Sequence, residues 1–286
     1  MENTRLMTRE IEVRRPEARV AHEAGSSGGR YGAFGVAWDM QSDDASLYRT
    51  LLERLPPGAV STPGKAPERA YALRTMPATL SETGASYLLL SDGRPLVRSS
   101  EAAEIADAFE DNLKWLVAER SPRKVFLRAG VVGWRDRAIV IAGGPGTGKR
   151  TLVRALVACG ASYFSDDYAV LEGNSVLPYP SRRHNWLEPG NALSHWLDEF
   201  APARAPKPVP VGVVLFAPYQ PGAVFKPKLI SRGKGLLEMF KHAVAAQRNP
   251  VHVLRALETV SRRCNALEGV RGDARTVATY LLDRLV

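Results

Sequence analysis

The feature that most constrains the fold is a glycine-rich stretch, GGPGTGKR, at residues 143–150. The apolar run AIVIAG before it predicts a buried strand, and the segment 149–160 after it predicts a helix that ends at Gly160. Glycines permit backbone conformations that side chains would block, so the amide hydrogens of such a loop can converge on phosphate oxygens. We therefore predict a strand–loop–helix unit that binds phosphate. The alternative is a glycine-rich turn with an incidental lysine.

The loop departs from its usual pattern, G-x-x-x-x-G-K-[ST], because Arg150 stands where a hydroxyl belongs. That hydroxyl is normally a magnesium ligand. Thr151 lies about 100° further around the helix, so it cannot simply substitute. A guanidinium contacts phosphate well, so nucleotide binding survives the change more easily than metal-dependent catalysis. Our candidate nucleotide-binding residues are Gly143, Gly144, Pro145, Gly146, Thr147, Gly148, Lys149, Arg150 and Thr151, with Lys149 reaching the outer phosphates.

Two adjacent carboxylates, Asp166 and Asp167, form the second signal, in YFSDDYAVL. They follow an apolar strand, and neighbouring side chains on a strand point to opposite faces. At most one of them faces the phosphates squarely, unless the strand ends there. A carboxylate near bound phosphate can hold magnesium or accept a proton from an attacking hydroxyl. The alternative is a solvated acidic turn.

The first half of the chain predicts a disordered tail over residues 1–30 and a small α+β domain over 31–122. YGAFGVAWDM is strand-like, and ASLYRTLLERLPPG predicts a helix that two prolines stop. ERAYALRTM and ASYLLLSDGRPLVRS are also strand-like, the latter with a hairpin turn at Asp92-Gly93. SSEAAEIADAFEDNLKWLVAERSP predicts a helix with a serine N-cap.

The second half, residues 123–286, predicts an α/β domain in which a sheet is covered by helices. VFLRAGVVGW, ASYFSDDYAVLE, NSVLPY and VPVGVVLFAPY are its further expected strands. Three helices close the chain, at about 231–247, 250–264 and 273–285. The segment from Lys226 to Arg248 carries six basic residues against Glu238. It either clamps an acidic substrate or forms a solvated helix face.

The net charge of +9 favours anionic partners such as nucleotides or acidic peptides, although a solvated basic surface explains it equally well. The sequence has neither zinc-finger spacing nor an RNA-binding signature, which argues against nucleic acid. It has no apolar run of about 18 residues and a polar N-terminus, so we expect a soluble, cytoplasmic protein without a membrane partner. Cys159 and Cys264 are expected on apolar helix faces, reduced and not bound to metal.

The chain from about residue 125 to 180, which includes FLRAGVVGWRDRAIVIAGGPGTGKRTLVRALVACGASYFSDDYAVL, resembles the C-terminal domain of HPr kinase/phosphorylase and its kinase-like relatives. That family shares its nucleotide fold with phosphoenolpyruvate carboxykinase. VLPYPSRRHNW and VGVVLFAPYQPGA also look like later segments of these relatives. Residues 1–120 show no such resemblance.

The resemblance implies a P-loop kinase-like fold, ATP and Mg²⁺ as cofactors, and assembly as a homo-oligomer. It implies that Asp166 is the base that deprotonates a serine hydroxyl and that Asp167 assists with metal. The family has a histidine at the position of Arg128, which counts as a third catalytic candidate. Arg128 and Arg150 are thus two cationic departures from the family pattern.

Three hypotheses follow for the function. The first is a kinase that transfers phosphate from ATP to a hydroxyl of a protein, peptide or small molecule, with catalysis by positioning and charge stabilisation. The second is a degenerate, non-catalytic nucleotide-binding scaffold or regulator. The third is a peptide-tailoring kinase that acts with other biosynthetic proteins.

Overall fold

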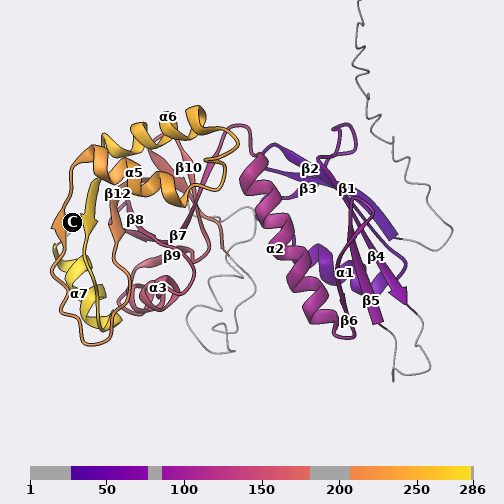
Figure 1. The fold of residues 1–286 in the computed structure, drawn as a ribbon, viewed down its shortest axis with the longest axis horizontal. Helices are drawn as coiled ribbons and strands as arrows, with labels where there is room; N and C mark the ends of the chain where they lie inside the picture. Colours follow the sequence, from indigo (N-terminus) through magenta and orange to yellow (C-terminus); the bar gives the residue numbers. More distant parts are fainter. Residues whose placement is uncertain (1–26, 77–85, 181–206, 285–286) are drawn as a thin grey trace, which may run out of the picture.

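The computed structural model describes residues 27–76, 86–180 and 207–284, and within these ranges it is a mixed α/β structure with two sheets and six helices (Figure 1). The two sheets divide the described chain into an N-terminal region, residues 27–120, and a C-terminal region, residues 125–284. The expected α/β class is therefore confirmed. None of the helices in the described ranges is long and apolar enough to cross a membrane.

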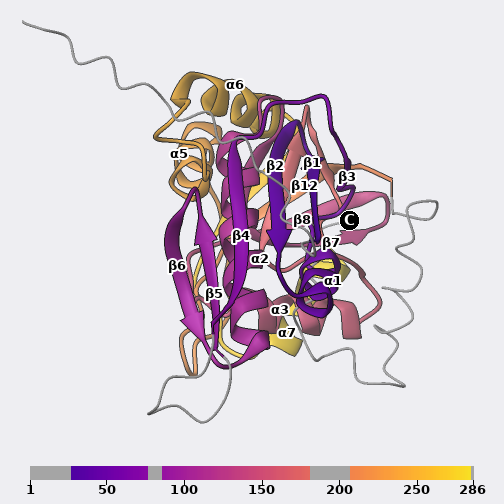
Figure 2. The ribbon, with the colours of Figure 1, turned by 90° about the vertical axis from the view of Figure 1, so that its right-hand side faces the viewer.

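The N-terminal region has six strands and two helices. Its elements are β1 (Ser27–Ala33), β2 (Val36–Ser42), α1 (Ala45–Glu53), β3 (Val60–Ser61), β4 (Arg69–Met76), β5 (Ser86–Ser91), β6 (Arg94–Ser99) and α2 (Ala102–Arg120). The strand order is β3-β1-β2-β4-β5-β6, with β2 and β4 parallel and the other pairs antiparallel. In Figure 2 the sheet stands in front of α2. Trp38, Tyr71 and Leu89 of the sheet share a core with Ile105 and Phe109 of α2.

Three expectations for this region were wrong. YGAFGVAWDM is a hairpin of β1 and β2 rather than one strand, because Phe34 (φ 51°) and Gly35 (φ 84°) adopt the two positive φ angles of a type I′ turn. The tail predicted over 1–30 is wrong for residues 27–30, since β1 begins at Ser27. There Arg30 forms an ion pair with Asp39 at 2.6 Å across the hairpin. The remainder of the predicted tail, residues 1–26, lies outside the described residues.

The third correction concerns the start of α2. Its N-cap is Glu101, which makes no side-chain capping bond. The hydroxyl of Ser99 instead accepts a hydrogen bond from the Glu101 amide at 3.0 Å and donates one to the Glu104 carboxylate at 2.6 Å. The serine thus supports the first turn from outside the helix. The helix of ASLYRTLLERLPPG and the hairpin at Asp92-Gly93 are confirmed.

The C-terminal region contains the second sheet. Its elements are β7 (Val125–Trp134), β8 (Arg137–Ala142), α3 (Lys149–Ala158), β9 (Ser162–Ser165), β10 (Tyr168–Glu172), β11 (Ser175–Leu177), β12 (Val209–Phe216), β13 (Lys228–Leu229), α5 (Arg232–His242), α6 (Pro250–Ser261), β14 (Asn265–Glu268) and α7 (Ala274–Arg284). The strand order is β11-β10-β7-β8-β12-β14-β13, and β9 also pairs with β7. Strands β8, β12 and β14 are parallel neighbours.

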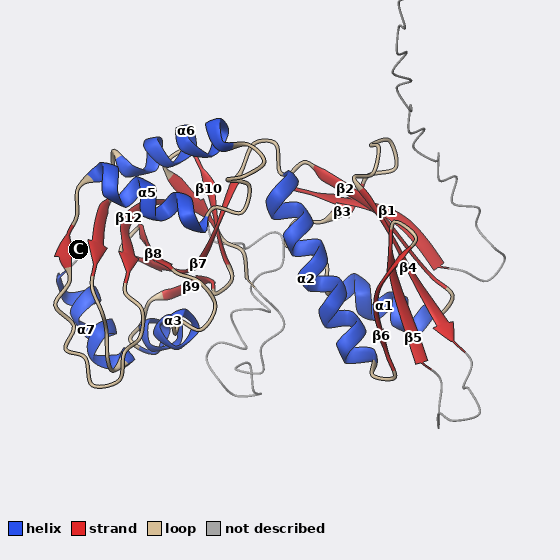
Figure 3. Cartoon of the chain, viewed as in Figure 1, coloured by secondary structure: helices blue, strands red, loops and turns tan. Residues whose placement is uncertain are grey.

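Helices cover both faces of this sheet, as Figure 3 shows, with α5 and α6 on one face and α3 and α7 on the other. The side chains of β8 alternate accordingly, because successive residues of a strand point to opposite faces. Ile139 and Ile141 join the core formed with α3 and α7, whereas Val140 joins the core formed with α5 and α6. A strand buried on both faces reads as a continuous apolar run, which is why AIVIAG was recognisable.

Two strand predictions here were incomplete. ASYFSDDYAVLE is not one strand but two, β9 and β10, because β9 pairs with the second half of β7 and β10 with its first half. The break falls at Asp166 and Asp167. Strand β14 was missed between the last two helices, since its four residues carry no periodicity of their own. Cys264 lies beyond the end of α6 rather than on a helix face, and burial raises the pKa of its thiol to about 11.

Candidate functional site

A cavity of about 820 Å³ lies where the glycine-rich loop, residues 143–148, meets the Asp166–Asp167 connection, the first half of β7 and helix α2. It collects every predicted site residue except Gly144 and Thr147. It also includes four residues that sequence reasoning missed, which are Asp111, Lys114, Trp115 and Tyr168. Three of these four come from α2 of the N-terminal region, so both regions form the walls of one cavity.

The glycine-rich loop connects β8 to α3, which confirms the predicted strand–loop–helix arrangement. Gly146 (φ 75°) and Gly148 (φ 78°) are in the left-handed region, where a side chain would strain the backbone. Gly148 is also the N-cap of α3 and offers the helix no side-chain cap. The first amides of α3 are therefore available to an acceptor outside the helix.

The direction in which the Gly148 and Lys149 N–H groups point follows from the hydrogen bonds of the carbonyl groups in the same two peptide units. The Thr147 carbonyl accepts from the Tyr219 amide at 3.1 Å, and the Gly148 carbonyl accepts from the Leu152 amide at 3.2 Å. The peptide bonds in the described ranges are trans, and a planar trans unit points its N–H opposite to its C=O. The N–H groups of Gly148 and Lys149 consequently point away from the Tyr219 and Leu152 amides, towards the side on which Gly148 and Lys149 line the cavity.

Lys149 is the first residue of α3, and its ammonium group donates to the Gly144 carbonyl at 2.6 Å, so the side chain lies along the loop. Burial lowers its pKa. The nearby aspartates, Asp167 and Asp166, oppose that change, whereas the cations Arg150 and Arg128 reinforce it. Lys149 therefore belongs to a cluster in which positive and negative charges lie close together. A further anion would be attracted to its ammonium group.

Asp166 is completely enclosed. Its side chain is 0% exposed, and Arg150 Nε donates to one carboxylate oxygen at 2.8 Å. The Tyr163 hydroxyl donates to the other oxygen, also at 2.8 Å. Both oxygens therefore have a partner inside the protein. The guanidinium of Arg150 therefore contacts Asp166 in the connection between β9 and β10. In the usual motif, residue 150 would be a serine or threonine with a hydroxyl group.

Asp167 differs from its neighbour because it is 27% exposed and faces the cavity. Lys114 Nζ donates to Asp167 Oδ2 at 3.0 Å, and Arg150 Nη2 lies 3.7 Å from Asp167 Oδ1. Strand β9 ends at Ser165 and β10 begins at Tyr168, so both aspartates lie in the connection between them and both line the cavity, which does not support a solvated acidic turn. Lys149, Arg150, Asp166 and Asp167 are accordingly brought together, as the sequence predicted.

Lys114 joins the cavity to the N-terminal region through a row of alternating charges. It contacts Glu110 at 2.6 Å, and Glu110 in turn contacts Arg54 at 3.1 Å. Burial lowers the pKa of Lys114, but Asp167 and Glu110 outweigh that effect and the net pKa is raised. Figure 1 shows α2, which carries Lys114, between the N-terminal sheet and the C-terminal region.

Arg128 lies on β7 opposite Tyr168 of β10, at the cavity wall. Its guanidinium is 5.1 Å from the centre of the Trp115 ring, a cation–π distance. Its carbonyl accepts from the Gly143 amide at 3.3 Å, which joins β7 to the start of the loop. The structure therefore places Arg128 beside the loop and against α2.

The basic segment from Lys226 to Arg248 does not line this cavity. Lys234 forms an ion pair with Glu268, and Lys241 one with Glu238 at 2.7 Å, and the Lys241 side chain is largely exposed. These contacts favour the solvated helix face over a clamp. The resemblance segment VLPYPSRRHNW falls mostly outside the described residues.

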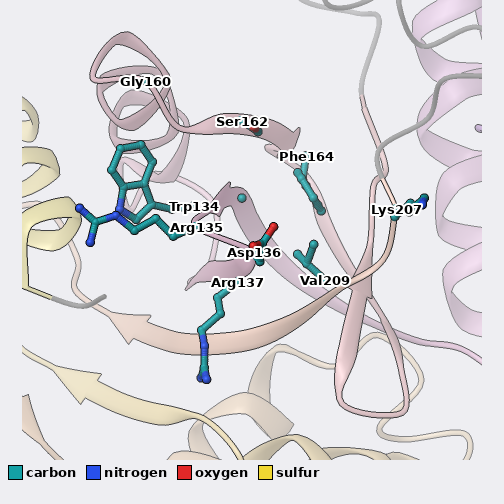
Figure 4. Close-up of a pocket in the computed structure, with 10 residues that line it drawn as sticks. Trp134, Arg135, Asp136, Arg137, Gly160, Ser162, Phe164, Lys207 and Val209 are labelled. Carbon is teal, nitrogen blue, oxygen red and sulfur yellow. The ribbon is translucent and has the colours of Figure 1, made fainter.

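A second cavity, of about 480 Å³, surrounds the turn between β7 and β8 (Figure 4). Arg135 lies over the ring of Trp134 at 5.7 Å, and Phe164 contributes to the lining. This cavity contains no residue that the sequence singled out and lies at the opposite end of β7 from Arg128. The loop cavity is therefore the candidate functional site.

The residues of α2 were missed because their role depends on the other region. Glu110 and Lys114 are four residues apart, next to the apolar positions Phe109 and Leu113 of the same helix. The one sequence feature that could have indicated them is this oppositely charged i,i+4 pair beside the apolar stripe of the helix. The pair alone does not reveal that Lys114 also contacts Asp167 of the other region.

No protein-family model matches the chain, and a search of curated proteins found no match either.

Proposed function

We propose that this protein binds ATP or ADP through the glycine-rich loop, in the manner of an HPr-kinase-like P-loop protein. One observation carries the proposal: the N–H groups of Gly148 and Lys149 and the Lys149 ammonium lie at the N-terminus of α3, on a cavity of about 820 Å³. That volume is in the range of small-molecule sites. Converging amides at a helix N-terminus favour a phosphate group.

The residues present fit a phosphate chain. An added Cβ at Gly144 or Gly146 would meet no atom within 4 Å, so the loop leaves open space on that side. Gly146 and Gly148 supply the left-handed conformations that curve the loop. Lys149 and Arg150 would hold the outer phosphates, and the loop amides would orient them.

The residues present do not fit magnesium in the usual way. The hydroxyl ligand is absent at position 150, and both oxygens of Asp166 are engaged by Arg150 and Tyr163. Asp167 is paired with Lys114. Within the described ranges no group of three His, Cys, Asp or Glu residues is placed to hold a metal ion. We therefore assign no step to a metal and propose that arginine and lysine supply the positive charge.

We further propose that the bound nucleotide is the phosphoryl donor to a hydroxyl on a protein, peptide or small molecule. Bound ATP supplies the phosphoryl group when it is present. Asp167, rather than the enclosed Asp166, is the carboxylate able to reach a substrate and accept the hydroxyl proton. The acceptor oxygen forms the new bond to phosphorus, and the bond to the leaving ADP oxygen breaks. Lys149 and Arg150 offset the charge.

A second candidate is a nucleotide-binding protein without turnover. The observation that favours it is that both aspartates already have cationic partners, Arg150 for Asp166 and Lys114 for Asp167. Under this candidate the nucleotide would be a regulatory or structural ligand.

Calorimetric titration of ATP and ADP tests the shared part of both candidates. We expect Lys149→Ala to weaken binding at least about tenfold, which is near 1.4 kcal/mol. Lys241→Ala is the matched control, because it removes an exposed lysine outside the cavity. Equal affinity of Lys149→Ala and the unaltered protein, with both folded, would show that the loop is not the nucleotide site.

A further inference from the structure

Arg271, between β14 and α7, has an environment that is unusual for an arginine. It is 1% exposed. Its Nη2 donates to the Gly148 carbonyl at 2.5 Å, and the Thr147 carbonyl lies at 3.5 Å. Its guanidinium is 5.8 Å from the centre of the Tyr219 ring. Arg271 thus contacts the loop from the side opposite to the cavity, and the sequence did not single it out.

The charge of Arg271 has no anionic partner in the described part of the chain. No Asp or Glu there lies within ion-pair distance, and the buried Nε donates to no acceptor. Burial lowers the pKa of this guanidinium. Removing a cation from water is expensive unless an anion compensates, and carbonyl dipoles compensate only in part.

The position of Arg271 is set by the fold rather than by its side chain. Its amide donates to the Pro218 carbonyl at 3.1 Å, and its carbonyl accepts from the Gln220 amide at 2.8 Å. A Cβ added at Gly148 would lie 2.5 Å from Arg271 Nη2, so the contact requires glycine at that position. The segment after β12 and the segment after β14 together hold the guanidinium against the loop.

These contacts have a direct consequence for the cavity side of the loop. The carbonyls that Arg271 approaches belong to the same planar peptide units as the N–H groups of Gly148 and Lys149. A cation on the carbonyl side fixes the orientation of each unit and polarises its N–H. It also adds a positive charge behind the loop, at a depth where water screens it poorly.

We propose that Arg271 is a positioning residue of the phosphate site, and that the charge complementing it is the phosphate chain of a bound nucleotide or inorganic polyphosphate. Arg271 acts through Thr147 and Gly148 and does not touch the ligand. This inference rests on the proposed nucleotide site, and it adds that a buried cation, besides Lys149 and Arg150, strengthens the affinity for the phosphates.

The test is calorimetric titration of ADP and of inorganic tripolyphosphate into four proteins: the unaltered chain, Arg271→Met, Arg271→Lys and Arg275→Met. We expect Arg271→Met to weaken both ligands at least tenfold. Arg271→Lys keeps the charge but loses the planar fork, so it should weaken them less than methionine does. Arg275→Met removes one charge from the exposed start of α7 and should leave both affinities unchanged. A loss with ADP alone would overturn the proposal, because tripolyphosphate contains only the phosphate chain.

Urea unfolding with and without saturating ADP separates positioning from a merely structural role. A positioning role predicts that Arg271→Met loses most of the stabilisation that ADP adds to the unaltered chain. A structural role predicts a lower baseline stability with the ADP increment unchanged, and that result would overturn the proposal. If Arg271→Met does not fold, the titrations of Arg271→Lys are the test. ADP and tripolyphosphate affinities of Arg271→Lys within twofold of the unaltered chain would refute the inference. Lys149→Ala distinguishes the two failures: if it also leaves ADP binding unchanged, the proposed nucleotide site itself is wrong.

Discussion

The two regions of this protein contribute to the cavity in different ways. The C-terminal region supplies a short local unit in which Gly148, Lys149 and Arg150 are consecutive residues at the start of one helix. The N-terminal region supplies one face of α2, on which Asp111, Lys114 and Trp115 line the cavity. The comparison shows that a local motif provides the groups at the start of α3 that line the cavity, whereas packing between the regions provides Lys114 as the partner of Asp167.

The difference extends to the burial of charge. Arg150 is half-exposed and pairs with the enclosed Asp166, whereas Lys114 is buried and pairs with the partly exposed Asp167. Each region therefore supplies one cation for one of two adjacent carboxylates. If α2 is held to the C-terminal region through Lys114, replacing that lysine should lower the stability of the folded protein.

The largest effect is expected from Lys114→Met. It removes the partner shared by two carboxylates, Glu110 and Asp167, one of which is buried. Breaking a buried ion pair by removing one partner costs about 3–5 kcal/mol. Urea unfolding of this variant measures the loss, with Lys241→Met as the exposed control. A loss below about 1 kcal/mol would mean that α2 is not held to the C-terminal region by this contact.

The pH dependence of stability is a second test of the Lys114 ion pairs. The pKa of Lys114 is raised in the folded protein above its ordinary value of 10.5, with burial opposing and Asp167 and Glu110 favouring the charge. Its contribution is therefore complete below pH 10.5 and is lost as the pH rises through the folded pKa. The stability gap between the unaltered chain and Lys114→Met should narrow above pH 10.5. A gap that is constant from pH 8 to 11.5 would contradict this sign.

Asp167→Asn is expected to reduce phosphoryl transfer, where transfer is detected, about 100-fold or more, because general-base catalysis typically contributes this much. Nucleotide affinity should change little. Asp166→Asn is the comparison variant, and it should lower stability instead, because Arg150 and Tyr163 lose an enclosed partner. Measuring turnover and urea stability for both variants tests the division of roles. Equal turnover losses with equal stability losses would remove the distinction between the two aspartates.

Arg150→Ser tests whether an arginine has taken the place of a divalent ion. The unaltered chain should bind ATP with similar affinity in magnesium and in chelator. The variant removes the Arg150 bond to one oxygen of Asp166 and restores a hydroxyl, so its ATP affinity should become magnesium-dependent by about tenfold, near 1.4 kcal/mol. Titrations under the two conditions give both numbers. Strong magnesium dependence and rapid transfer in the unaltered chain would show that another ligand serves the metal.

The smallest effect is expected from Trp115→Ala, which removes the ring beneath Arg128. The tryptophan is 36% exposed, and exposed cation–π contacts contribute about 0.5–1 kcal/mol. The change should lower stability by that amount and leave ADP affinity unchanged. Trp115→Phe, which keeps an aromatic face, should recover part of the loss. If Trp115→Ala reduced the free energy of ADP binding by more than the free energy of unfolding, Trp115 would instead contact the nucleotide directly.

Local sequence was sufficient wherever neighbouring residues decide the structure. The hairpin at Asp92-Gly93 follows from two residues that tolerate positive φ angles, and α3 follows from its apolar spacing and Gly160. The split between β9 and β10 was not predictable in the same way. It depends on which half of β7 each strand pairs with, and β7 is distant in the sequence, since Ser162 of β9 pairs with Gly133 and Leu171 of β10 pairs with Val125. Strand β14 likewise exists because β12 offers it a parallel edge.

Local sequence was therefore enough to predict the glycine-rich loop together with the strand before it and the helix after it. These depend on backbone conformations and side chains within a few residues of each other. The pairing of Lys114 with Asp167, and the contact of Arg271 with the carbonyl groups of the loop, depend on how the chain folds in three dimensions. Those contacts join residues 53 and 123 positions apart. No local pattern encodes such a pairing, because its energy arises only when packing removes both partners from water.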